Sequence, residues 1–441
     1  MNHPLSLIGI ILLLGSFPLS AQSSLQSRPF SHLSQAEYLE DFKVFVNTLV
    51  EKHPHPYKFT GKATFWKKVK EKEQQFSDKT TLAEFIWHCS EMIALLGCSH
   101  TSLGWFNQED AMLPMELRFP LDAKLLEDRL YISDPLRNSK KVQAGAEIFS
   151  INGYPISEIT TLAFQHISSQ AHIQTYKRLL FSGYITAYIP FVLGFPEKYE
   201  IVIKGRTSPI LLDPLTSYKP KSRYHRIVSN APCQQDLCFR QNDNYTAILT
   251  IKSFAYYGER FATFRSFIDE SFGELKAKDI KNLIIDLRFN GGGASLAANH
   301  LLQYLAQTPY TYFQHNEFDH LKEEQQPFDK AFNGSLYILM DGDGQSTTGH
   351  FLSLIKEFKL ATIIGEELAS NRFCTANQKK YSMPHSGISF SVARNTFITS
   401  AQSSPDSHGV LPDHFITQGI EDHLNNIDTV LEYALQLIEK E

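Results

Sequence analysis

Two stretches, Leu283-Ile-Ile-Asp-Leu-Arg-Phe-Asn-Gly-Gly-Gly293 and Leu336-Tyr-Ile-Leu-Met-Asp-Gly-Asp-Gly-Gln-Ser-Thr-Thr-Gly-His350, decide the fold of this chain of 441 residues. Each begins with a short apolar run typical of a buried strand, enters a glycine-rich turn and continues into a predicted helix. The first turn offers backbone N–H groups without side chains in the way, and the second places the Ser346 hydroxyl at a helix start. An oxyanion site beside a nucleophile is what acyl transfer requires.

Strands and helices alternate regularly on both sides of these stretches. Residues 245–251 and 361–364 are predicted as buried strands, and residues 261–275 and 427–438 as helices. Such alternation indicates a mainly parallel, layered sheet. We therefore expect an α/β domain over residues 241–441, within a multidomain α+β chain.

The sequence before residue 241 predicts three further parts. Residues 32–105 form a helical N-terminal region, in which Thr81-Leu-Ala-Glu84 is a capping box ahead of an apolar helix face. Residues 110–165 form a small β unit with an Asn-Gly turn, which resembles the core of a PDZ domain and could bind extended peptides; a plain β scaffold is the alternative. Residues 166–240 are expected to be a connector with strands.

Bulk composition excludes some classes of protein. Hydrophobic residues make up 42% and charged residues 20%, as in an ordinary folded protein. The net charge is −5 and the pI is near 6.4, without a basic run, which argues against nucleic acid as the main partner.

The N-terminus reads as a secretory signal over residues 1–21. Residues 5–14 are almost wholly apolar, and small residues precede a cleavage point near Ala21. We expect a secreted or periplasmic protein without a membrane span after cleavage; an uncleaved anchor or a mis-set start codon is the alternative. Of five cysteines, Cys233 and Cys238 are close enough in sequence to pair, although free buried thiols are equally compatible. No zinc-ligand spacing appears, so no metal site is predicted.

Ser346 is the candidate nucleophile, and an ordinary helix-capping serine is the alternative. The Asn290–Gly293 turn is expected where backbone approaches another group closely. Phosphate binding is disfavoured, because no Lys-Ser/Thr follows the glycines. Asp286 and Arg288 are expected to hold this turn by hydrogen bonds.

A serine nucleophile needs a base to accept its proton. His100, directly after Ser99 at the end of a predicted helix, is our candidate. His350, one helical turn after Ser346, is the rival, but the apolar residues around it predict burial.

Taken in order, the segments of this chain resemble the tail-specific, C-terminal-processing serine peptidases, particularly the branch like the tricorn core domain. The matching segments are Ser99-His100, Gly145-Ala-Glu-Ile-Phe-Ser-Ile-Asn-Gly153, Asp286-Leu-Arg-Phe-Asn-Gly-Gly-Gly293, the Ser346 turn, Ile364-Gly-Glu-Glu367 and Gly409-Val-Leu-Pro-Asp413.

The resemblance implies a crotonase-like catalytic domain that cleaves polypeptides without a metal or cofactor. Ser346 would be the nucleophile, five residues after Asp341, and His100 its base. An acidic residue further along the chain, for which Asp406 is the candidate, would orient the catalytic residues through Ser99. The oxyanion hole would consist of backbone N–H groups of Gly291, Gly292 and Thr347.

The sequence also departs from the family pattern. Asn371 stands where one branch has a lysine base, so a Ser–Lys pair is excluded at that place. Leu368-Ala-Ser370 replaces the usual Thr-Gly-Gly, and the glutamate expected after the serine turn is missing. A different alignment would make Thr347 the nucleophile, but the spacing from Asp341 favours Ser346. The expected function is a serine endopeptidase; the alternative is a degenerate scaffold that binds peptides or apolar ligands.

Overall fold

The computed structural model describes residues 28–104, 113–218, 233, 235–316 and 320–440. The expected signal segment, residues 1–21, lies outside these ranges. Within them, no helix combines the length and the apolar composition that crossing a bilayer requires.

The N-terminal region is built of three helices, α2 (Gln35–Lys52), α3 (Lys62–Glu73) and α4 (Leu82–Ala94). The predicted capping box is present at α4, where Thr81 and Glu84 exchange side-chain and backbone hydrogen bonds. The apolar face of α4 is buried against α2 and α3, with Phe85, Ile86 and Met92 fully enclosed.

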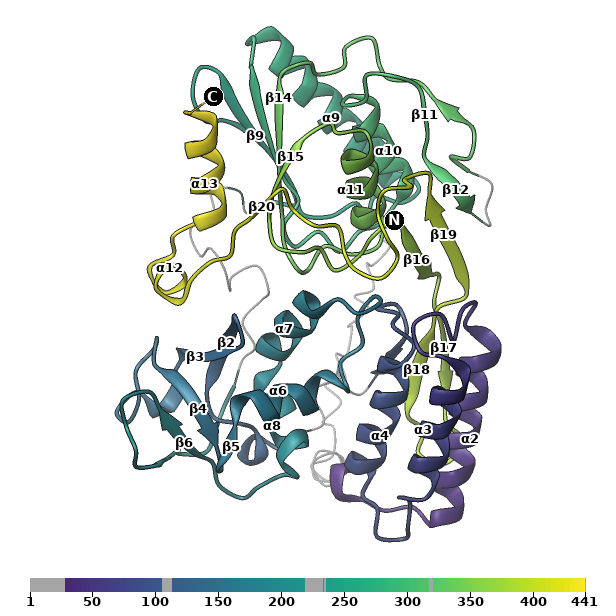
Figure 1. Ribbon diagram of the computed structural model, residues 1–441, viewed down its shortest axis with the longest axis vertical. Coiled ribbons are helices and arrows are strands. Elements are labelled where there is room, and N and C mark those ends of the chain that lie inside the picture. The colour runs from purple at the N-terminus through teal and green to yellow at the C-terminus, as the bar shows by residue number, and fades with distance from the viewer. Residues whose placement is uncertain (1–27, 105–112, 219–232, 234, 317–319, 441) are drawn as a thin grey trace, which may run out of the picture.

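A hairpin from the far end of the chain completes this helical core. Strands β17 (Lys379–Ser382) and β18 (Ser389–Val392) pair with each other, and β18 also pairs with β1 (Ser102–Leu103). Figure 1 shows the hairpin descending from the α/β domain to lie beside α2, α3 and α4. Phe390 packs edge-on against Phe45 of α2, with ring centroids 5.0 Å apart. Residues 379–392, which we expected within the α/β domain, therefore share the N-terminal core.

The β unit is an antiparallel sheet with the order β2-β3-β4-β6-β7, and a short strand β5 pairs with β4. Its strands are β2 (Asp122–Leu126), β3 (Arg129–Asp134), β4 (Glu147–Ile151), β5 (Tyr154–Pro155), β6 (Glu200–Ile203) and β7 (Ile210–Leu211). Asn152 and Gly153 both have positive φ, as the predicted Asn-Gly turn requires.

Three helices complete the β unit: α6 (Ile156–Phe164), α7 (Gln174–Gly183) and α8 (Ile185–Leu193). Phe181 and Ile189 are buried in the same core as the strand residues Ile148 and Ile201. The segment that we expected to be a connector therefore contributes two helices and two strands to this core.

The α/β domain contains a six-stranded sheet with the order β20-β15-β14-β10-β9-β8. All neighbouring strands are parallel except β8 and β9, so the expected α/β sheet is confirmed. The strands are β8 (Leu237–Gln241), β9 (Thr246–Ile251), β10 (Asn282–Asp286), β14 (Ser335–Met340), β15 (Thr362–Gly365) and β20 (His414–Phe415).

Helices cover both faces of this sheet (Figure 1). Leu283 and Ile285 of β10 face the core beneath α9 (Arg260–Ala277), α10 (Ser295–Gln303) and α11 (Thr347–Glu357), whereas Ile284 faces α13 (Thr429–Ile438). A smaller antiparallel sheet, β12 (Phe313–Asn316), β19 (Asn395–Thr399) and β16 (Phe373–Ala376), lies beside α11. Among the described residues, the remaining strands are β11 (Tyr310–Thr311) and β13 (Glu324–Gln325), and the remaining α-helix is α12 (Ile420–Asn425).

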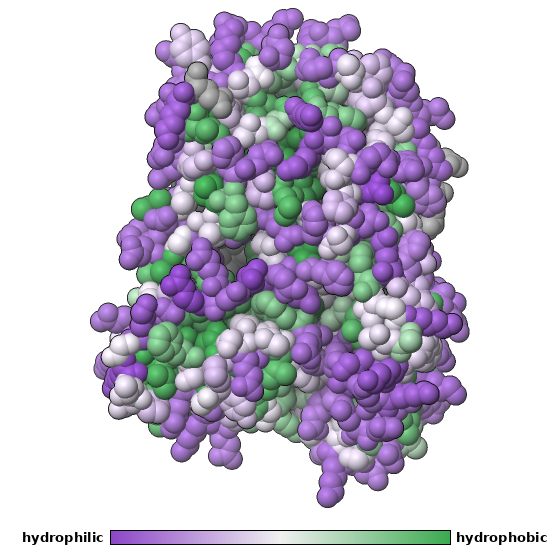
Figure 2. All heavy atoms as spheres, in the orientation of Figure 1, coloured by the Kyte–Doolittle hydropathy of each residue, from purple (hydrophilic) through white to green (hydrophobic). Residues whose placement is uncertain are grey.

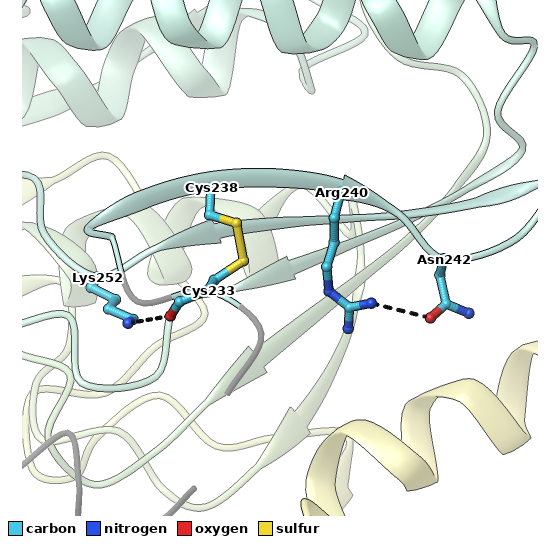
Figure 3. The surroundings of a disulfide bond; sticks show 5 residues. All are labelled: Cys233, Cys238, Arg240, Asn242 and Lys252. Carbon is cyan, nitrogen blue, oxygen red and sulfur yellow. Dashed lines mark hydrogen bonds between the residues drawn. A yellow bond between two sulfur atoms is a disulfide. The ribbon is translucent and has the colours of Figure 1, made fainter. Parts of the chain in front are cut away.

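Cys233 and Cys238 form a disulfide bond at the edge strand β8 (Figure 3). The Lys252 ammonium donates to the Cys233 carbonyl at 2.7 Å. The alternative of free thiols at this pair is therefore wrong. Cys89, Cys98 and Cys374 are free and buried.

Candidate active site

Ser346 occupies a strained turn between β14 and α11. Its φ is 55° and its ψ −121°, in a region that side-chain-bearing residues rarely adopt. Such a strand-to-helix turn exposes a nucleophile at the carboxyl edge of a sheet. The Ser346 side chain makes no capping hydrogen bond, which disfavours the helix-capping alternative.

The glycine turn after β10 packs directly against Ser346. A Cβ atom on Gly292, whose φ is +93°, would lie 2.8 Å from Ser346 Cβ and 2.9 Å from the Thr347 nitrogen. This close approach explains why the position must be glycine. The Gly292 N–H donates to Asn290 Oδ1 at 2.9 Å. Within the described residues, the N–H groups of Gly291 and Thr347 have no hydrogen-bond partner.

The threonines after Ser346 fix the two turns to each other. Thr347 Oγ1 donates to the Gly293 carbonyl at 2.6 Å, and Thr348 Oγ1 donates to the Asn290 carbonyl at 2.8 Å. Because the Thr347 hydroxyl is held in this bond, the geometry favours Ser346 over Thr347 as the nucleophile.

Asp341 connects the glycine turn to the serine turn by hydrogen bonds. Its carboxylate accepts the N–H groups of Phe289 and Asp343, each at 3.1 Å through Oδ1. Burial, followed by the negative charge of Asp343, raises the pKa of Asp341 to about 8. The sequence showed that Asp341 lies five residues before Ser346, but it did not show that the Asp341 carboxylate contacts the glycine turn.

Arg288 anchors the glycine turn to the end of the chain. Its guanidinium donates to Asp286, through Nε at 2.9 Å and Nη2 at 2.7 Å, and to Asp428, through Nη1 at 2.6 Å and Nη2 at 2.8 Å. Asp428 also caps α13 by accepting the Leu431 N–H. The expected structural role of Asp286 and Arg288 is therefore confirmed, and it extends to α13.

His100 approaches this site from the N-terminal region, six residues after the end of α4 at Ala94. Its Nδ1 lies 3.4 Å from Ser99 Oγ and 3.7 Å from the Cys374 sulfur. The Cys374 thiol, on β16, also lies near the Ser346 side chain. Cys374 thus lies near both His100 and Ser346, which are both partly exposed. Sequence reasoning missed Cys374, because only the tertiary fold brings it to the serine.

The surroundings of His100 keep its imidazole neutral. Burial lowers the pKa of His100 to about 4 from its ordinary 6.5. A neutral imidazole is the form that can accept a proton.

His350, the rival base, is enclosed by aromatic rings. Its ring lies 5.3 Å from that of Phe313 and 6.4 Å from that of Phe397. In the described part of the chain, neither of its ring nitrogens has a hydrogen-bond partner. Burial, and secondarily the charge of His100, lower the pKa of His350 to about 3. Its enclosure among these apolar rings disfavours it as the base.

Asp406 is held by two cations. Lys58 donates to it at 2.9 Å and Arg372 Nε at 3.1 Å. Among the described residues, Ser99 Oγ bonds only to His100, so the geometry does not link Asp406 to Ser99. Asn371, where one branch of the family has a lysine, donates to the Asp406 and His408 carbonyls.

The altered Leu368-Ala-Ser370 segment packs tightly beside the serine turn. A Cβ atom on Gly344 would lie 2.2 Å from Leu368 Cδ1, and one on Gly349 would lie 2.0 Å from Ser370 Oγ. The substituted residues therefore form a buried wall behind the turn and the first turn of α11.

A cavity of about 860 Å³ lies between the β unit and the α/β domain. Strand β2 and helix α7 line one side, and Phe289, Asp341 and Glu366 belong to the other. Figure 2 shows the surface hollowed between the upper and lower halves of the molecule. Phe289 and Asp341 belong to the glycine turn and the serine turn, whereas Gly292, Ser346 and His100 are not among the residues that line the cavity.

Comparisons with known proteins agree with this geometry. The model of peptidase family S41 matches residues 245–416, which include Ser346, Cys374 and the glycine turn. No curated protein matches the chain.

Solved structures share the fold. Mature CPAF complexed with lactacystin is 13% identical, with a TM-score of 0.62 over 92% of this chain and 99% of that one. A putative peptidase from Parabacteroides merdae is 15% identical, with a TM-score of 0.51 over 92% and 96%. Residues 245–416 of the α/β domain therefore carry the sequence pattern of peptidase family S41.

Proposed function

We propose that this S41 peptidase is an active serine endopeptidase, with Ser346 as nucleophile and His100 as general base. The observation that carries the proposal is the backbone of Ser346: a φ of 55° is strain that a merely structural serine would not need. The neighbouring Gly292 and the nearby neutral His100 support it.

His100 accepts the Ser346 proton as the hydroxyl oxygen attacks the scissile carbonyl. The oxyanion that forms lies against the N–H groups of Thr347 and Gly291, which have no partner among the described residues. The Gly292 N–H joins them when it leaves Asn290 Oδ1. His100 then protonates the leaving amine, and water hydrolyses the acyl-enzyme.

The substrate is an extended polypeptide that enters along the cavity between β2, α7 and the α/β domain. The PDZ-like β unit forms one wall of this path. We further propose a secreted or periplasmic location. The Cys233–Cys238 disulfide supports it, because such bonds persist mainly in oxidising compartments.

A ligand-binding protein without proteolytic activity is the second candidate. Two observations favour it: Asp406 is paired with Lys58 and Arg372, and the Gly292 N–H is already bonded to Asn290. The first observation leaves the catalytic residues without their expected acidic partner, and the second leaves the oxyanion hole without one of its expected N–H donors.

Labelling of the mature protein with a fluorophosphonate, read by intact mass, separates the two candidates. We expect one adduct on the wild type and none on Ser346→Ala or His100→Ala. Thr347→Val is the matched control and should still react. The absence of an adduct from the folded wild type across pH 5–9 would contradict the peptidase proposal.

A further inference from the structure

The proposed base and the proposed nucleophile come from different parts of the chain. His100 lies in a turn, Cys98–Thr101, that the Thr101 N–H closes by donating to the Cys98 carbonyl at 3.2 Å. Cys98 is buried in the N-terminal core, whereas Ser346 follows β14 of the α/β domain. Proton transfer requires the two side chains within hydrogen-bond reach. An element that contacts both turns would therefore set their separation.

One continuous segment of the β unit, residues 168–175, contacts the histidine turn. It runs from the end of α6 into the first turn of α7. Ser168 Oγ donates to the Cys98 carbonyl at 2.8 Å, and the Ala171 N–H donates to the Gly97 carbonyl at 2.9 Å. Two residues of this segment thus hold the backbone that leads into His100.

Gln170 joins the same segment to the strand beside His100. Its Nε2 donates to the Phe373 carbonyl of β16 at 3.3 Å, and its side chain is 1% exposed. The next residue of β16, Cys374, has its sulfur 3.7 Å from His100 Nδ1. The segment therefore fixes the histidine turn and β16 relative to each other.

The far end of the segment contacts the serine turn, residues 341–346. A Cβ atom on Gly342 would lie 2.5 Å from Thr175 Cγ2, so Thr175 packs directly on the backbone of this turn. Thr175 Oγ1 also donates to Glu367 Oε2 at 3.2 Å. Figure 1 shows α7, which begins one residue before Thr175, on the side of the β unit that faces the α/β domain.

The backbone between these two ends is held in one conformation. Ala171 has a φ of 50°, which residues with side chains rarely adopt. Such strain persists only where the surroundings over-determine the backbone, and it is concentrated at functional sites. Ser169 and Ile173, on either side, are each 1% exposed. The segment is therefore a rigid connection between the histidine turn and the serine turn.

We propose that residues 168–175 hold His100 at the distance from Ser346 that proton transfer needs, an inference that rests on the proposed peptidase function. Ser168 and Gln170 are positioning residues, because they act through His100. The β unit then forms part of the catalytic site as well as one wall of the substrate path.

Ser168→Ala and Gln170→Met test this role. Each removes one donor to a backbone carbonyl and keeps most of the side-chain shape, whereas Ser168→Thr keeps the hydroxyl. Tyr199→Phe is the matched control. The Tyr199 hydroxyl donates to the Leu117 carbonyl at 2.7 Å inside the core of the β unit, so this variant loses the same kind of bond away from the histidine turn.

The first readout is fluorophosphonate labelling at a series of reagent concentrations, with thermal unfolding as the check on folding. We expect the maximal labelling rate of Ser168→Ala and of Gln170→Met to fall at least about tenfold, because small displacements of a catalytic group are costly. The half-saturating reagent concentration should not change. Ser168→Thr should label faster than Ser168→Ala, and Tyr199→Phe should keep the wild-type rate.

The second readout, hydrogen exchange measured by mass spectrometry, does not depend on activity. Peptides that cover the histidine turn should exchange faster in Ser168→Ala and Gln170→Met than in the wild type or Tyr199→Phe, because the turn has lost a support.

Wild-type labelling and exchange in both variants, or an equal loss of labelling in Tyr199→Phe, would overturn the positioning role. If the wild type still labels in a manner that requires Ser346 and His100, that result leaves the peptidase function standing. A folded wild type that never labels would instead remove the peptidase function, and with it this role.

Discussion

At the scale of single residues, Gly292 and Gly291 offer a matched test of the oxyanion turn. A Cβ on Gly292 would meet Gln345 O at 2.6 Å and Ser346 Cβ at 2.8 Å, and its φ is +93°. A Cβ on Gly291 meets nothing within 4 Å. We expect Gly292→Ala to lower the rate of fluorophosphonate labelling by about 10²-fold or more, because the Ser346 turn must shift.

Gly291→Ala keeps its backbone N–H and has room for the methyl group. Its labelling rate should stay within about threefold of the wild type. Equal losses in both variants would mean that the close approach of Gly292 to Ser346 does not matter for reactivity.

The lowered pKa of His100 predicts an unusual pH profile. A base works only when neutral, so reactivity should fall as the pH drops through about 4, rather than near 6.5. Labelling rates between pH 3.5 and 8 on a folded sample would give the midpoint. A midpoint between 6 and 7 would show that another group, or a solvated His100, controls the step.

At the scale of elements, Arg288 fastens α13 to the glycine turn. Its guanidinium is 8% exposed and bonded to both Asp286 and Asp428. Arg288→Met leaves two partly buried carboxylates without their cation, and we expect the free energy of unfolding to fall by about 3–5 kcal/mol. Urea unfolding measures this loss.

Lys281→Met is the control, because its pair with Asp279 is largely exposed. Exposed pairs contribute little, so stability should hardly change. A loss for Arg288→Met no larger than that of the control would show that the network does not hold α13.

At the scale of the whole molecule, buried histidines should make the fold sensitive to acid. Burial lowers the pKa of six of them: His53, His88 and His100 to about 4, His166 and His350 to about 3, and His320 by a smaller amount. Below pH 6.5 the unfolded chain binds protons that the native state rejects, so stability falls with each step toward pH 4. Asp341, whose pKa is raised to about 8, acts in the opposite direction but is a single group.

We therefore expect the free energy of unfolding to drop steeply between pH 6.5 and 4. Each proton that the unfolded chain binds and the native state does not changes the free energy of unfolding by about 1.4 kcal/mol per pH unit. Urea unfolding at a series of pH values checks this, and a flat profile down to pH 4.5 would contradict it. His166→Phe should reduce the slope, because one fewer proton is then bound on unfolding.

Domain organisation was the part of the fold that the sequence predicted least well. The hairpin β17–β18 reads as part of the α/β domain, yet Phe390 and Val392 are buried with the N-terminal helices. Helices α7 and α8 lie in the expected connector, yet they complete the core of the β unit. Local patterns show which residues need burial but not which partner buries them.

The sequence by itself determined the parallel sheet, the glycine turn after β10 and the serine turn after β14. These depend on short-range rules: apolar runs of strand length, glycines where φ is positive, and caps at helix ends. Only the tertiary structure decided the surroundings of Ser346. It brought Cys374 to His100, enclosed His350 among aromatic rings, and paired Asp406 with Lys58 and Arg372. Those contacts join residues far apart in the chain, and their geometry depends on how whole elements pack rather than on any local pattern.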